Sequence, residues 1–259
     1  MYEDAQMNNE ADMVAAQTFD TENTAKEARY NKRTVLLSSV ALGAAAFLCD
    51  LVPGTLGTML LTLTSSGLAW GMVALTTGFR QNTWRAAVLG STATLLIATV
   101  VYYAMVLGVS QRWRGGNLQD GSSADFISLL SVGRAAAFWA IASLCAGPLL
   151  GTIGWKMRVG SERQSSILIA ASFGLFSAES FDALVLRASL REHLQYFGQQ
   201  FMQPAFLTIA LSALATSYLL WRRKIRFATV TFIASAFFSV ALGILLWRFV
   251  SFARVLISV

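Results

Sequence analysis

The chain has 259 residues, of which 55% are hydrophobic and 13% are charged, and its mean hydropathy is +0.55. A soluble domain usually carries close to twice this charged fraction, so the composition excludes an ordinary soluble domain. The formal net charge is +6, but the basic residues lie in short segments between apolar runs, where membrane proteins place them for orientation. Nucleic-acid binding is therefore not expected, and the lipid bilayer is the expected partner.

Residues 1–33 are polar, rich in Asn, Gln and Glu, and contain no long apolar run. We interpret them as a cytoplasmic tail without stable structure, followed by one transmembrane helical domain over residues 34–259. A cleaved signal peptide has a much shorter leader before its apolar core. The first apolar run is therefore expected to stay in the protein.

Seven apolar runs approach the length of about 20 residues that a bilayer-crossing helix needs. They predict an all-α polytopic bundle of about seven spans, at 34–52, 55–78, 86–109, 132–155, 166–186, 205–221 and 227–248. Pro53-Gly54 ends the first helix and lets the chain reverse, so the first two spans are expected to form a hairpin. The last run, 227–248, is expected to cross the membrane as the seventh span. The alternative is that residues 227–259 fold back.

The distribution of Lys and Arg predicts the orientation. Of the 20 residues, thirteen fall on the side of the N-terminal tail, six fall on the opposite side, and Arg134 lies near the start of the fourth span. Cytoplasmic loops carry the excess of Lys and Arg, so the N-terminus is expected in the cytoplasm.

Residues 187–203 are too polar to cross the membrane. Leu190, Leu194, Phe197 and Phe201 recur at helical spacing, which predicts an amphipathic helix on the outer leaflet. The alternative is a connecting loop.

Two carboxylates lie inside the fifth span. Glu179 and Asp182 are three residues apart and so share one face of a helix. Arg134 enters the fourth span from the same side, which predicts an Arg134–Glu179 ion pair. Ionisable groups inside a span usually face protein or a water-filled cavity, so this pair either locks two helices together or belongs to a ligand site.

Four more residues are expected at a similar depth in the outer half of the membrane: Asp50, Tyr102, Tyr103 and Trp139. Aromatic residues near a membrane surface are most often anchors. Together with the charges, however, these side chains predict an outward-facing polar cavity for a small polar or zwitterionic solute. In this hypothesis Arg134 holds an anionic group, Glu179 a cation, and a tyrosine stacks on the solute.

Small residues mark two helix faces. Gly147, Pro148 and Gly151 combine a helix-kinking proline with the spacing that lets helices approach closely, and they are interpreted as a hinge or as tight packing. Ala41 and Ala45 form a second such face, suited to a neighbouring helix of this chain or of a partner.

The sequence contains no signature of an enzyme. His193 is the single histidine, and neither a serine elbow nor a P-loop occurs. Cys49 and Cys145 fall at different depths, so neither a disulfide nor a metal site is expected. We therefore predict no enzyme activity, no cofactor and no metal.

Several short motifs carry a resemblance to a known family. They are Gly67-Leu68-Ala69-Trp70-Gly71, then Trp84-Arg85-Ala86-Ala87 and Val101-Tyr102-Tyr103, then the run from Ala146 to Trp155, and Ala178-Glu179-Ser180. Over about residues 60–220 the chain resembles a bacterial family of multi-pass membrane proteins with a domain of unknown function. This resemblance implies an architecture and a bacterial plasma-membrane location, and it implies no chemistry.

The chain is also similar, more weakly, to the substrate-capturing membrane subunits of energy-coupling-factor vitamin transporters. The similarity lies in size, in a cytoplasmic N-terminus, in a small-residue first helix with Ala41 and Ala45, and in an outward-facing site. The chain departs from those subunits in its seventh span and in its long outer amphipathic segment.

Two functions remain as hypotheses. The first is a solute-binding or transport subunit that uses the outer cavity and works with an ATPase or another membrane partner. The second is a non-catalytic scaffold or accessory subunit, in which the glycine faces and the basic segment 222–226 bind partners.

Overall fold

The computed structural model describes residues 32–65, 67–117, 121–189, 198–223 and 229–258. Within these residues all named elements are helical, and seven helices are long and apolar enough to cross a membrane. The prediction of an all-α transmembrane bundle is thus confirmed. Most of the predicted tail, residues 1–31, lies outside the described residues, and so do residues 190–197 of the predicted amphipathic segment.

The elements follow the predicted order. They are a first helix, Lys32–Cys49, then α2 (Gly54–Ser65), α3 (Gly67–Arg80), α4 (Trp84–Met105), the π-helical turn η1 (Val106–Ser110), α5 (Asp125–Val159), α6 (Glu162–Ser189), α7 (Gly198–Arg223) and α8 (Thr229–Ser258).

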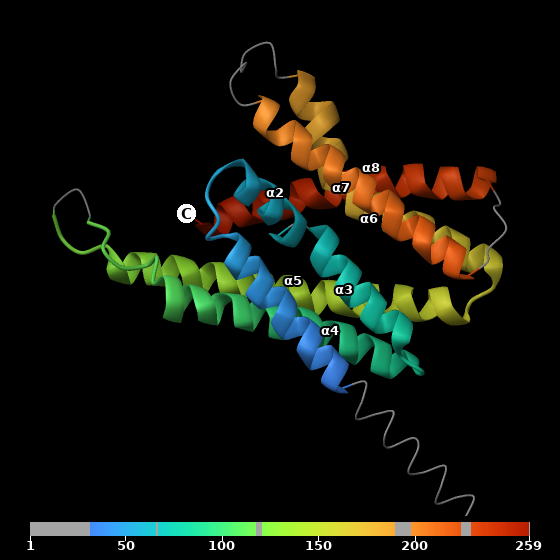
Figure 1. Ribbon diagram of the computed structural model, residues 1–259, viewed down its shortest axis with the longest axis horizontal. Helices are drawn as coiled ribbons and strands as arrows, with labels where there is room; N and C mark the ends of the chain where they lie inside the picture. Colours follow the sequence, from blue (N-terminus) through green and yellow to red (C-terminus); the bar gives the residue numbers. More distant parts are fainter. Residues whose placement is uncertain (1–31, 66, 118–120, 190–197, 224–228, 259) are drawn as a thin grey trace, which may run out of the picture.

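Successive spans run in opposite directions through the bundle. Figure 1 shows α4 and α5 side by side, joined at the left, while α3 meets α4 and α5 meets α6 at the right. We call the end with the short turns 81–83 and 160–161 the basic end. The opposite end, with segments 50–53 and 111–124, is the loop end.

The second predicted span corresponds to α2 and α3, which together make one candidate span, Leu56–Arg80. The fourth predicted span differs from the observed helix. The fourth span was predicted to start at residue 132, whereas α5 begins at Asp125 and has 35 residues. α5 also continues without interruption through Pro148.

The interface among α3, α4 and α5 is built by glycines that bring backbones into contact. A Cβ on Gly78 would lie 2.6 Å from the carbonyl oxygen of Gly151, and one on Gly154 would lie 2.3 Å from that of Leu75. A Cβ on Gly147 would lie 2.4 Å from Cα of Thr92. Helices in a membrane gain stability mainly from such close packing.

Buried hydroxyl groups join the same three helices. Ser91 donates from Oγ to the carbonyl of Ala74 at 2.7 Å, and Thr94 donates to Thr77 Oγ1 at 3.4 Å. Thr99 Oγ1 and Ser143 Oγ lie 3.3 Å apart between α4 and α5. In a bilayer the buried polar atoms must find partners inside the protein, and here they link one helix to the next.

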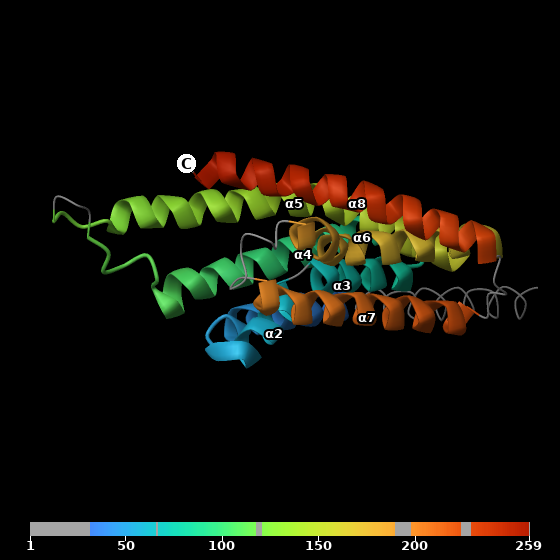
Figure 2. The ribbon, with the colours of Figure 1, turned by 90° about the horizontal axis from the view of Figure 1, so that it is seen from above.

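The first helix and α8 cover opposite flanks of the bundle (Figure 2). Gly43 lets the first helix approach α4, since a Cβ there would lie 2.4 Å from the Ala98 carbonyl oxygen. α8 packs on α6, where added Cβ atoms on Gly174 and Gly243 would meet Ser239 and Ala178.

The free face of α8 is apolar. Phe237 is 79% and Phe238 is 70% exposed, and both line a shallow groove whose lining residues all belong to α8. A large exposed apolar face is unfavourable in water. In a membrane, however, it is the expected surface of a helix that faces lipid tails.

Candidate functional site

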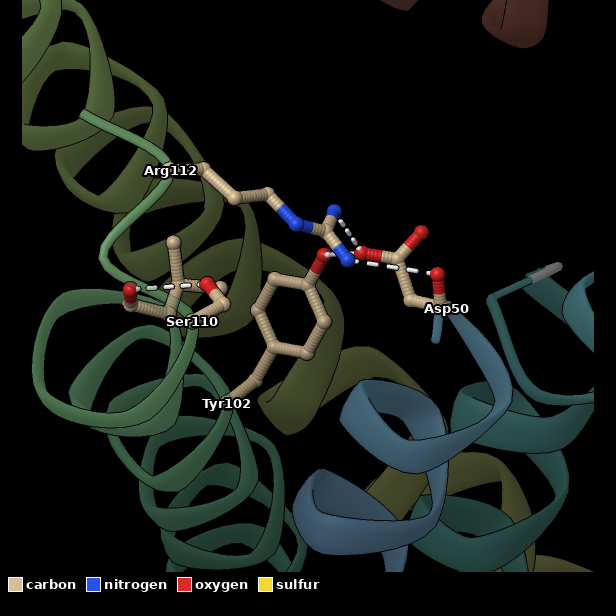
Figure 3. Close-up of polar contacts among 5 residues, drawn as sticks. Asp50, Tyr102, Ser110 and Arg112 are labelled. Carbon is tan, nitrogen blue, oxygen red and sulfur yellow. Dashed lines mark hydrogen bonds and ion pairs between the residues drawn. The ribbon is translucent and has the colours of Figure 1, made fainter. Parts of the chain in front are cut away.

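The loop end contains a cluster of polar and aromatic side chains from the first helix, α4 and the segment after it. Arg112 forms an ion pair with Asp50 and also donates from Nη2 to the Asp50 carbonyl at 3.2 Å. Tyr102 donates from its hydroxyl to Asp50 Oδ2 at 3.5 Å. Figure 3 shows the three side chains converging from opposite sides. We call Asp50, Tyr102 and Arg112 the Asp50 cluster.

Unusual backbone geometry places Arg112 in this cluster. α4 passes into the π-helical turn η1, and Gln111 then adopts a left-handed conformation with φ of 45°. A side chain in this region carries strain of about 1–3 kcal/mol, and π-helical turns occur frequently at functional sites. The chain leaves the helix axis at Gln111, and Arg112 therefore turns toward the first helix instead of continuing outward.

The carbonyl groups of the first two residues of η1 are satisfied locally. Val106 accepts from the Gln111 N–H at 3.1 Å and from Ser110 Oγ at 3.0 Å, the latter drawn in Figure 3. Leu107 accepts from Trp113 Nε1 at 3.2 Å. These bonds compensate for the helical bonds lost at a helix end and hold the strained turn in place.

The Asp50 cluster is accessible from outside the protein. The side chain of Arg112 is 44% exposed and that of Asp50 is 19% exposed. Tyr102 also packs edge-on against Tyr103, with ring centroids 5.1 Å apart. A planar guanidinium with half its surface free, beside two aromatic rings, can hold a carboxylate or phosphate group.

Of the seven residues predicted for the ligand site, three thus lie together: Asp50, Tyr102 and Tyr103. Arg112 also belongs to the Asp50 cluster, but it was not among the predicted site residues. A signal for it was present, because Asp50 was expected at the same membrane boundary as the loop that carries Arg112 and Arg114.

Asp182 belongs to a different contact. It accepts from Arg248 Nε of α8 at 3.1 Å, and the two side chains are 20% and 53% exposed, respectively. This ion pair joins α6 to α8, so Asp182 acts in helix association.

The predicted Arg134–Glu179 ion pair is wrong. Both residues are exposed, and the ion pairs among the described residues do not include one between them. The depths explain the error: Arg134 lies about 37 Å along α5 from its end at the basic end, whereas Glu179 lies about 25 Å along α6. α6 also diverges from α5 toward the loop end (Figure 1).

Trp139 is half-buried on α5. Its ring packs edge-on against Phe138 with centroids 5.3 Å apart, and its carbonyl accepts from Ser143 Oγ at 2.7 Å. The ring thus contacts a neighbour on its own helix, while the Trp139 carbonyl binds the same serine hydroxyl that meets Thr99 of α4.

The two predicted small-residue faces differ in how far they are buried inside the bundle. Gly147 and Gly151 are buried against α3 and α4, and Pro148 between them is half-buried. In the first helix Ala45 is half-buried and Ala41 is exposed.

Two side-chain contacts lie where α2 meets α3. Trp70 donates from Nε1 to the Thr64 carbonyl at 2.7 Å. Trp247 of α8 packs on Gly67, where an added Cβ would lie 2.7 Å from its ring.

Among the described residues, no group of three or more His, Cys, Asp or Glu side chains is placed to hold a metal ion. A comparison of the chain with protein-family models, with curated proteins and with solved structures found no match. The function is therefore inferred from the residues of this chain.

Proposed function

We propose that this multi-pass membrane protein is a solute-binding or transport subunit, and that its site is the Asp50 cluster at the loop end. The observation that carries the proposal is the strained turn at Gln111, which holds a half-exposed guanidinium between a carboxylate and a tyrosine. Strain of this kind persists where the surrounding structure maintains it, and it is concentrated at functional sites.

The expected solute is a small molecule with a carboxylate or phosphate group. Arg112 already shares its charge with Asp50, so an anionic group would bind the remaining N–H donors of the guanidinium while Asp50 keeps the fork oriented. An amino group on the same solute would find Asp50 within reach. A zwitterion therefore matches the cluster better than a simple anion.

The orientation belongs to the same proposal. The excess of Lys and Arg at the basic end favours a cytoplasmic basic end and N-terminus, and the family resemblance favours the bacterial plasma membrane. The cluster would then open outward. The sequence contains no P-loop, so the energy for active transport by this chain would come from a partner such as an ATPase or from an ion gradient.

The scaffold alternative loses part of its support. It relied on the glycine faces to bind partners, and Gly147 and Gly151 are already in contact with α3 and α4 of the same chain. Native mass spectrometry of gently solubilised protein separates the two functions, since a solute-binding subunit retains a small molecule and a scaffold retains proteins.

The direct test is ligand-dependent thermal stabilisation across a panel of amino acids, carboxylates and phosphate esters. A ligand at 100 times its Kd stabilises the folded state by about 2.7 kcal/mol. We expect this shift in the wild type, its loss in Arg112→Ala, and its retention in Arg134→Ala, which removes an exposed arginine from the same half of the bundle. The proposal fails if Arg112→Ala responds to the identified ligand as the wild type does.

A further inference from the structure

The basic end differs sharply in charge from the loop end. Among the residues whose side chains the structure describes, the ends of α3 to α7 carry six basic residues there and one acid, Glu162; the six are Arg80, Arg85, Lys156, Arg158, Arg163 and Arg222. Among the same described side chains, the half of the bundle toward the loop end carries four arginines and four acids. The basic end is therefore the more positively charged of the two ends in the part of the chain that the structure describes.

The contacts between α4 and α5 bring two of these cations to nearly the same level. An added Cβ on Gly151 would meet the Ala87 carbonyl oxygen at 2.5 Å, and Arg158 donates from Nη1 to Asn82 Oδ1 at 3.0 Å. Because the helices are antiparallel, this register places Lys156 of α5 level with residues 82–84, within one helical turn of Arg85 of α4. Both residues are exposed.

Trp84 lies across the same pair of helices. Its Nε1 donates to Thr152 Oγ1 of α5 at 3.2 Å, while half of its surface, 50%, stays exposed. A tryptophan in this position is typical of the level of the lipid headgroups. Tyr218 and Trp221 are exposed near the same end of α7, and they indicate the same headgroup level.

A negative group is favoured here for a further reason. α4 begins at Trp84, with Thr83 capping the Ala86 N–H at 3.2 Å. The positive end of the helix dipole thus lies beside Arg85 and adds to its field. Arg158 is already bound to Asn82, whereas Arg85 and Lys156 are exposed.

We infer that Trp84, Arg85 and Lys156 form a binding site for the phosphate of an anionic phospholipid. The two cations flank the headgroup phosphate, and the indole ring of Trp84 lies at the boundary between headgroup and acyl chains. Basic groups between transmembrane helices near the cytoplasmic surface bind anionic headgroups by this chemistry.

The test is native mass spectrometry of the delipidated full chain, titrated with phosphatidylglycerol or with phosphatidylcholine of the same acyl chains. We expect the wild type to retain phosphatidylglycerol preferentially. Each neutralised cation near the membrane surface should weaken this binding about five-fold, so that Arg85→Gln/Lys156→Gln loses most of the preference.

Three further variants make the result specific. Arg163→Gln/Arg222→Gln removes two exposed charges from the same end on α6 and α7, and it should leave the preference nearly unchanged. Arg85→Lys/Lys156→Arg keeps both charges and should retain binding, which separates the loss of charge from a loss of fold. Arg112→Ala should also retain binding, because the lipid site is independent of the Asp50 cluster.

Three results would overturn the inference. They are equal retention of the two lipids by the wild type, an equal loss in the Arg163/Arg222 control, and displacement of phosphatidylglycerol by millimolar inorganic phosphate. The last result would assign the site to the free anion instead of a lipid.

Discussion

The interface among α3, α4 and α5 and the cluster at the loop end are held together by different kinds of contact. In the first, backbone atoms meet across glycines and buried hydroxyls bridge the helices. In the second, an exposed arginine lies against a carboxylate and a tyrosine. Backbone contacts cannot adapt to an added atom, whereas an exposed ion pair opens at small cost. The loop end is therefore the region where side chains can change partners.

One methyl group added at Gly151 should destabilise the protein more than the loss of a hydroxyl bridge or of an exposed ion pair. In Gly151→Ala the new Cβ would lie 2.5 Å from the Ala87 carbonyl oxygen, which belongs to the backbone and cannot rotate away. Overpacking of this kind lowers the free energy of unfolding by about 1–3 kcal/mol. Denaturation in detergent with increasing SDS would measure the loss.

Gly133→Ala is the matched control on the same helix. An added Cβ there meets no atom within 4 Å, and alanine is the better helix former. Stability should stay the same or rise. Equal losses of stability at Gly133 and Gly151 would show that the close backbone contact at Gly151 does not make this position sensitive.

A smaller effect is expected when a hydroxyl bridge is removed from the same interface. Ser91→Ala removes the bond to the Ala74 carbonyl, and single interhelical bonds in membranes contribute about 0.6 kcal/mol. Ser38→Ala removes a bond within the first helix, from Ser38 Oγ to the Val35 carbonyl, and should have less effect. The same SDS titration compares the two variants.

The ion pair between α6 and α8 should contribute about as little as surface pairs do. A double-mutant cycle with Asp182→Asn and Arg248→Gln should yield a coupling energy of about 0.2–1 kcal/mol, because the Arg248 side chain is 53% exposed. The coupling should decrease as salt is added. A coupling above about 3 kcal/mol that ignores salt would place this pair in a dry interior instead.

The smallest effect is expected at Arg134. Its side chain is exposed, and no contact supports the ion pair predicted for it with Glu179. Arg134→Ala should change the free energy of unfolding by less than about 0.5 kcal/mol, as measured by thermal denaturation in detergent. A large loss would reinstate a structural role for this arginine.

The number of spans could be predicted because each bilayer crossing requires an apolar run of about 20 residues, which is visible in the sequence. The meeting of Asp50 with Tyr102 could also be predicted, since both residues were expected near one membrane boundary. The same boundary indicates the loop that carries Arg112 and Arg114, but which arginine meets Asp50 depends on the π-helical turn and on the left-handed Gln111, and neither has a clear sequence signature. The Arg134–Glu179 pair failed because depth was estimated from apolar runs, which omitted the first seven residues of α5.

The 35 residues of α5 extend over about 52 Å, compared with about 30 Å for the hydrocarbon core of a bilayer. Even a tilt of about 40° leaves roughly 10 Å of the helix above that core. The first turns carry exposed Phe126, Ile127 and Leu130, which water solvates poorly. A thicker membrane would immerse these side chains and a thinner one would leave them in the headgroup region. Hydrophobic mismatch at one end of α5 thus couples the energy of the protein to bilayer thickness, and it favours residence in the thicker parts of a membrane.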